Sequence, residues 1–138
     1  MIRFNLQLFG SRGASSGRKG GGSGVTNSQE YREGYDFERS MRLEDAVVPA
    51  ALPSENRSDE AVEAQMRGYA SAIGDPVRAM ERQRDSIRRE LADYEEGAVT
   101  ADSIGIRDAM RDIASEYDSA IDRMRRIRQN SRYGDMLR

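Results

Sequence analysis

The second half of the chain places its apolar residues at helical spacing. A first helix is expected between Ser58, a typical N-cap residue, and Gly74, a typical stop. Its apolar residues recur at intervals of four, three and four: Val62, Met66, Tyr69 and Ile73. This pattern predicts an amphipathic helix with one apolar face.

A second helix is predicted directly afterwards. Asp75 and Pro76 supply an N-cap and a proline at the first helical position, the pattern runs to about Glu96, and Gly97 follows. A heptad-like stripe contains Val77, Met80, Ile87, Leu91 and Tyr94. Arg84 interrupts this stripe. We favour an arginine that lays its methylenes over the seam and keeps its charge in water, and the alternative is a buried ion pair that fixes the register.

The third predicted helix, residues 101–129, carries the most regular pattern. Thr100 or Asp102 can cap it, and its apolar residues alternate strictly between spacings of four and three: Ile106, Met110, Ile113, Tyr117, Ala120, Met124 and Ile127. A short turn at residues 97–100 would fold helices two and three into an antiparallel hairpin, beyond which the arginine-rich end of helix three overhangs. The predicted fold is therefore all-α, a coiled-coil-like hairpin with a short preceding helix and a disordered Gly/Ser-rich N-terminus.

The first half of the chain gives weaker signals. Residues 1–28 combine a short strip of alternating apolar and polar residues with a run rich in glycine and serine, which is typical of a flexible tag and linker. In residues 29–57, apolar residues could lie along a short helix, but Gly34 and two prolines limit it. We expect a weakly ordered connector at 29–57, the helical domain at 58–130 and a basic tail at 131–138.

Composition narrows the possible functions. Charged residues make up 33% of the chain and hydrophobic residues 37%, so the core must be thin and self-association is expected. Cysteine and histidine are absent, which removes thiolate nucleophiles, the usual general base and the commonest transition-metal ligands. We expect no catalytic residues, no metal and no cofactor. No apolar run is long enough to span a bilayer, so no membrane contact is expected.

Two charged clusters are candidates for chemistry. Asp108, Asp112 and Glu116 repeat every four residues, and we interpret them as a solvated face in which Asp108 pairs with Arg111, in preference to a metal or acid–base site. A possible polyanion contact consists of Arg123, Arg125, Arg126, Arg128 and Arg132. The helix dipole also favours cations at a C-terminus, so nucleic-acid binding is possible but not favoured.

One segment resembles a known sequence family. Residues 5–17 read NLQLFGSRGASSG, which resembles the N-terminal tag NLQLFGGRGxSSG of otherwise unrelated gene products of tailed phages and prophages of Gram-positive bacteria, with Ser11 in place of a glycine. The resemblance covers about a tenth of the chain and implies a head-morphogenesis context. We expect the tag to contact a partner through Phe4, Leu6, Leu8, Phe9 and Arg12, either as an added strand or by inserting its apolar side chains.

The resemblance leads to a functional expectation. The chain would be a phage virion or head-assembly accessory protein, not an enzyme, that contacts a capsid, portal or scaffold protein in the virion or the host cytoplasm. The tag's period of two suits a β-strand added to the edge of a partner's sheet. The alternatives are a small inhibitor of a host defence enzyme and, less favoured, a nucleic-acid-binding accessory protein.

Overall fold

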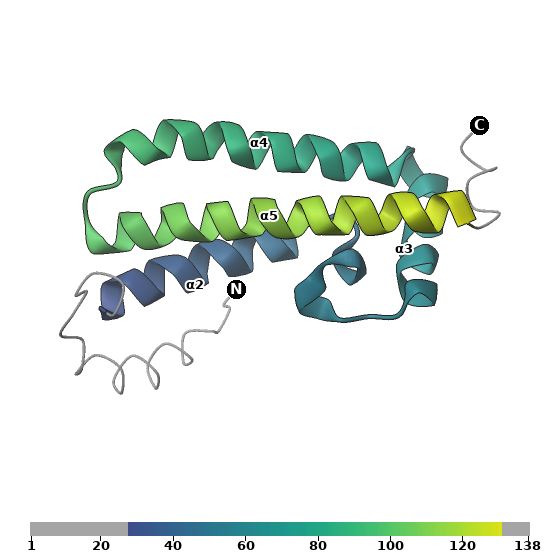
Figure 1. Ribbon diagram of the computed structural model, residues 1–138, viewed down its shortest axis with the longest axis horizontal. Coiled ribbons are helices and arrows are strands. Elements are labelled where there is room, and N and C mark those ends of the chain that lie inside the picture. The colour runs from purple at the N-terminus through teal and green to yellow at the C-terminus, as the bar shows by residue number, and fades with distance from the viewer. Residues whose placement is uncertain (1–27, 131–138) are drawn as a thin grey trace. The chain divides into compact units, whose positions relative to one another are not determined.

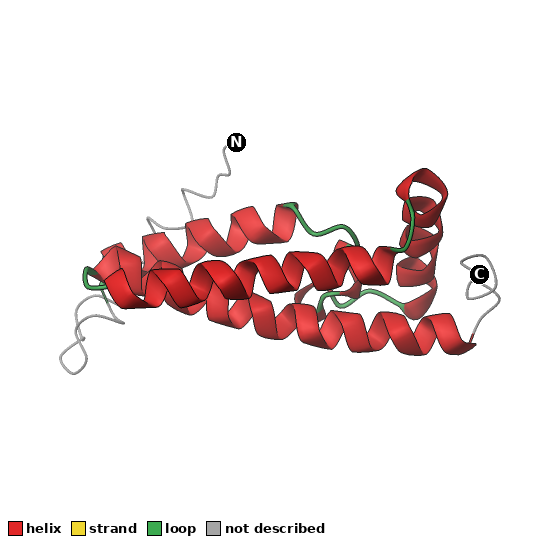
Figure 2. Ribbon diagram, turned by 90° about the horizontal axis from the view of Figure 1, so that it is seen from above, coloured by secondary structure: helices red, strands yellow, loops and turns green. Residues whose placement is uncertain are grey.

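A computed structural model of the chain describes residues 28–130, and Figures 1 and 2 show that this part is helical. Its helices are α2 (Gln29–Glu44), α3 (Asp59–Ile73), α4 (Pro76–Gly97) and α5 (Ala101–Asn130), with 3₁₀ turns η2 (Pro49–Ala51) and η3 (Pro53–Glu55). Residues 28–130 contain no strand, and α4, the connection at 98–100 and α5 form the predicted antiparallel hairpin. The all-α prediction is confirmed for this part of the chain. Residues 1–27 and 131–138, including the tag and Arg132, lie outside it.

The helix boundaries follow from the capping residues that the sequence supplies. The Ser58 hydroxyl accepts a hydrogen bond from the Ala61 amide at 3.2 Å. The Asp75 carboxylate accepts one from the Val77 amide at 3.0 Å at the start of α4. Thr100 caps α5, because its hydroxyl accepts from the amide of Ser103 at 3.3 Å. These side chains satisfy backbone donors that have no partner inside the first turn of a helix.

The described residues divide into two compact units, and α4 and α5 contribute to both. Unit 1 contains residues 28–43 and 88–113, which include α2, the end of α4 and the start of α5. Unit 2 contains residues 44–87 and 114–130, which include α3, both 3₁₀ turns, the start of α4 and the end of α5.

Unit 2 holds the larger apolar core. The seam predicted for helix three is buried here: Tyr117 is 1% exposed, and Ala120, Met124 and Ile127 are also buried. They pack in a unit whose other buried side chains are apolar as well, among them Val48, Leu52, Val62, Met66, Val77 and Met80. Such side chains supply most of the free energy of packing.

The structure differs from the sequence-based expectation over residues 29–57. Residues 29–44 form a 16-residue helix, and Val48 and Leu52, in the segment expected to be a connector, are fully buried in unit 2. The two prolines that argued against order each begin a 3₁₀ turn, where their missing amide hydrogen is tolerated. Gly34, expected to limit a helix, lies in the middle of α2.

Candidate functional site

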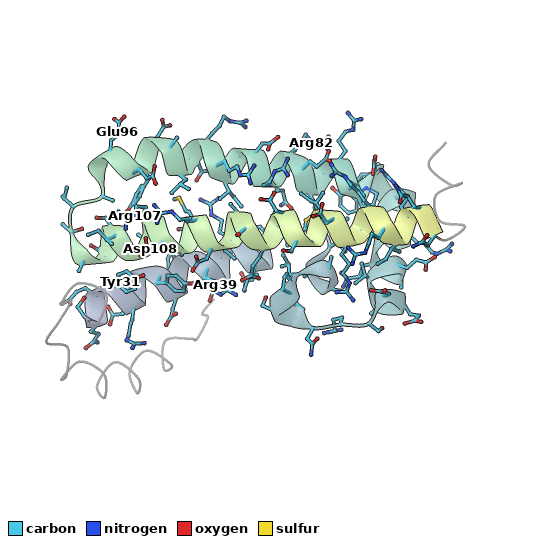
Figure 3. All side chains as sticks on the ribbon, viewed as in Figure 1. Tyr31, Arg39, Arg82, Glu96, Arg107 and Asp108 are labelled. Atoms are coloured by element: carbon cyan, nitrogen blue, oxygen red, sulfur yellow. The ribbon has the colours of Figure 1, made fainter. Side chains whose placement is uncertain are left out.

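The contact between α2 and α5 in unit 1 brings together acidic and aromatic side chains. The Tyr31 hydroxyl donates a hydrogen bond to the Asp108 carboxylate at 2.7 Å, and the Tyr35 hydroxyl donates one to Asp112 at 2.5 Å. The two tyrosine rings are stacked, with centroids 6.1 Å apart. Figure 3 shows Tyr31 on α2 beside Asp108 and Arg107 on α5. The tyrosines and aspartates are each spaced by four residues, so the two bonds repeat along successive turns.

These hydrogen bonds change the acidity of both partners. Burial raises the pKa of the Tyr31 hydroxyl, and its hydrogen bond to Asp108 raises that pKa further. Burial opposes ionisation of Asp108, but hydrogen bonds from Tyr31 and Arg107 hold the pKa of its carboxyl below the ordinary value. The pair therefore keeps a neutral phenol against a charged carboxylate across the neutral pH range.

A close crossing of two glycines sets the position of α2 on α5. Both Gly34 and Gly105 are buried. A Cβ atom on Gly105 would clash with the Tyr31 carbonyl oxygen, and one on Gly34 would clash with the Asp102 carbonyl oxygen. Neither position can hold a larger side chain without a backbone shift, so the glycines allow the two helix backbones to touch.

A second polar contact ties α2 to α4. The Arg42 guanidinium binds Glu38 on its own helix at 2.6 Å and Glu90 on α4 at 2.5 Å. Although burial lowers the pKa of Arg42, hydrogen bonds to Glu90 and Glu38 leave it above its usual value. Glu38 is the buried charged residue of unit 1, and this arginine neutralises it.

The acidic side chains that were predicted to form a solvated face on helix three therefore also make specific contacts with α2. Asp108 pairs with Arg111 as expected, at 3.4 Å, and with Arg107 at 2.8 Å, but it also accepts the Tyr31 hydroxyl. Asp112 binds Tyr35. Sequence reasoning missed the tyrosines because they lie 77 residues away along the chain. The shared four-residue spacing of both sets is the signal that could have indicated the pairing.

Two hollows on the described surface contain charged side chains. One in unit 1, of about 330 Å³, opens to solvent and is lined by Tyr31, Arg32, Tyr35, Asp36 and Asp112. Another in unit 2, of about 190 Å³, lies between residues of α3 and α5 and includes Asp59 and Arg126. Within residues 28–130, no three acidic side chains gather closely enough to hold a metal ion.

The arginine-rich end of α5 does not extend as a bare overhang, because it packs inside unit 2. Arg123 binds Asp59 of α3 at 2.8 Å, Arg128 binds Asp75 at 2.9 Å, and Arg125 binds Glu81 of α4. Arg126 is exposed and lines the smaller hollow. Of the cations proposed for a polyanion contact, three are thus engaged with carboxylates of the chain itself, and contact with a polyanion stays a prediction.

Arg84, the charged residue in the seam of α4, forms an ion pair within unit 2. Its side chain is 20% exposed, and its guanidinium lies 2.9 Å from Asp118 of α5 and 3.1 Å from Asp85. The hydrogen bond to Asp118 raises the pKa of Arg84, so the charge is retained. The side chain combines features of both interpretations, since it is mostly covered but keeps part of its surface in water.

Comparisons with known proteins give no assignment. No known family, no characterised protein and no solved structure matches the chain. None of the helices in the described part has both the length and the apolar character needed to cross a membrane.

Proposed function

We propose that this chain is a virion or head-assembly accessory protein of a tailed phage that works through protein–protein contacts. The observation that carries the proposal is the segment 5–17, whose sequence resembles the phage tag over 13 consecutive positions. The partner is a capsid, portal or scaffold protein. The chain binds it in the host cytoplasm during assembly and remains bound to it in the virion. In this proposal the chain binds its partner and catalyses no reaction.

The helical part, residues 28–130, is called the body here, and its structure supports separate roles for the tag and the body. The core of residues 28–130 is built from side chains between Ala46 and Ile127. A body with its own core can carry an N-terminal tag that is free to bind elsewhere. Two hollows on the described surface are lined in large part by charged side chains, whereas sites for small organic ligands are mostly apolar.

The tag's pattern suggests how it would bind. Phe4, Leu6 and Leu8 alternate with polar residues, so in an extended conformation their side chains would share one face. An added strand gains backbone hydrogen bonds from the edge of a partner's sheet, and the alternate side chains provide specificity. Phe9 would fall on the opposite face.

The test is incorporation into particles with two matched double variants. Leu6→Asp with Leu8→Asp places charges on the apolar face of the strip, and Asn5→Asp with Gln7→Asp places the same charges on the polar face. We expect the first variant to be lost from purified particles and the second to be retained. Far-UV circular dichroism should show equal helicity for both, because the core lies after residue 45.

Two outcomes would overturn the proposal. One is equal incorporation of both double variants, which would show that the apolar face of the tag has no role. The other is that the chain is absent from particles but co-purifies with a host enzyme in cells that lack other phage proteins. That result would favour the inhibitor hypothesis.

A further inference from the structure

Helix α2 is attached to the rest of unit 1 without a fully buried apolar side chain of its own. Its buried residues are Gly34, which has no side chain, and Glu38, which is charged. Phe37, the largest apolar side chain of the helix, is 55% exposed. The other aromatic and large apolar residues of the helix are only half-buried: Tyr31, Tyr35, Met41 and Leu43. Helix α2 therefore gains part of the free energy that full apolar burial would provide.

Polar contacts hold α2 in place. They include the hydrogen bonds of Tyr31 and Tyr35 to aspartates of α5 and the ion pair of Arg42 with Glu90 of α4. Contacts of this kind fix the register of a helix, but each adds only modest net stability, least where the groups are exposed. The glycine crossing sets the separation of the helices and buries little side-chain area.

The chain is anchored immediately after α2. The Gln83 side-chain amide donates to the Asp45 carbonyl at 2.7 Å, and its oxygen accepts from the Val47 amide at 3.2 Å. Val48 is fully buried in unit 2. Glu44 and Asp45 themselves are exposed. A movement of α2 would therefore end at residues 44–45, because the following residues belong to the core of unit 2.

We propose that α2 is a releasable latch, which dissociates from α4 and α5 as one segment hinged at residues 44–45 while unit 2 stays folded. Release uncovers the glycine crossing on α5. Ser28, the N-cap of α2, moves with the helix. The latch is independent of the phage assignment, because it rests on contacts within residues 28–130.

Hydrogen–deuterium exchange of the full-length chain, read by mass spectrometry, tests the latch. A detached 16-residue helix is marginal in water, so each release exposes the amides of α2 to exchange. We expect residues 32–44 to exchange together and much faster than residues 117–127 of α5. Tyr31→Phe removes one hydrogen bond to a carboxylate and should speed exchange of 32–44 about tenfold, with 117–127 unchanged.

Tyr69→Phe is the matched control, since it makes the same chemical change on α3 of unit 2 and should leave the exchange of residues 32–44 unaltered. Gly105→Ala provides a second route, because its Cβ would displace α2 without altering a polar group. It should bring 32–44 close to the rate of an unstructured peptide. Equal rates for 32–44 and 117–127, with an equal response of both to Tyr31→Phe, would overturn the latch and show that the two segments open only together.

Discussion

Units 1 and 2 share the helices α4 and α5 but stabilise them differently. Unit 2 buries many large apolar side chains, such as Tyr117, Leu52 and Met66. Unit 1 buries fewer, Met110 and Ile113 of α5 among them, and its contacts with α2 include glycine backbones, tyrosine–aspartate hydrogen bonds and an arginine between two glutamates. An apolar core tolerates changes at its charged surface but responds strongly to cavities. A polar interface with close backbones responds to single hydroxyls and single methyl groups. The hairpin of α4 and α5 therefore has a stable part in unit 2 and, in unit 1, a part that is suited to movement.

The largest effect should come from a cavity in unit 2. Tyr117→Ala removes the largest fully buried side chain and should lower the free energy of unfolding by about 3–5 kcal/mol, as large-to-small changes in cores do. Urea denaturation followed by circular dichroism measures this loss. Phe37→Ala, an aromatic truncation at an exposed position of α2, is the comparison and should change stability by less than about 1 kcal/mol. Similar losses for the two variants would remove the proposed difference between the units.

A smaller effect is expected at the glycine crossing of unit 1. Gly105→Ala forces a Cβ against the Tyr31 carbonyl and should cost about 1–3 kcal/mol, limited by the free energy that holds α2 in place. Gly68→Ala is the matched control, because no atom lies within 4 Å of the added Cβ on α3. It should stabilise the chain by about 0.5–1 kcal/mol, the usual gain from replacing a glycine within a helix. Opposite signs in thermal unfolding would support the crossing, and a stabilising Gly105→Ala would contradict it.

The ion pair of Arg84 and Asp118 should contribute less. A double-mutant cycle with Arg84→Met and Asp118→Asn should give a coupling of about 0.5–1 kcal/mol, because both side chains keep contact with water. Arg84→Met alone should be nearly neutral, since a methionine can fill the apolar seam. If Arg84→Met cost several kcal/mol, the pair would instead be essential to the register of α4 against α5 in unit 2.

The pH dependence should be the smallest effect, and two groups of unit 1 should contribute to it. The pKa of Asp108 is lowered in the folded chain, so its contribution is present above the unfolded-state pKa of about 3.9 and is lost as the pH falls through the lower folded value. The pKa of Tyr31 is raised, so its contribution is present below about pH 10 and is lost in more alkaline solution. Thermal unfolding at several pH values measures both trends. Asp108→Asn should flatten the acidic one, and an unchanged acid profile would contradict this assignment.

The hairpin could be predicted from the sequence because its signals are local. The caps Asp75 and Thr100 and the heptads of α5 each lie within a few residues of the backbone that they organise. The buried face of α5 is wider than the strict seam, since Ala109, Ala114 and Ile121 are buried as well. A two-helix heptad pattern does not include residues covered by further elements, so this width was not predictable from spacing alone.

The contacts of α2 could not be predicted in the same way. Tyr31 meets Asp108 across 77 residues of sequence, and Gly34 looks like a helix breaker until a second backbone is placed against it. The ion pairs of the arginine-rich end likewise depend on where α3 and α4 place Asp59 and Glu81. Charged residues carry little positional information in a sequence, because almost any surface position accepts them.

The most direct test of the proposed function is quantitative mass spectrometry of purified particles and proheads from the genome that encodes this chain. We predict that the protein is present in them at a fixed copy number relative to the major capsid protein. Peptides covering residues 1–17 would show that the tag is retained after assembly. Clear expression in producing cells together with absence from both particles and proheads would contradict the assignment.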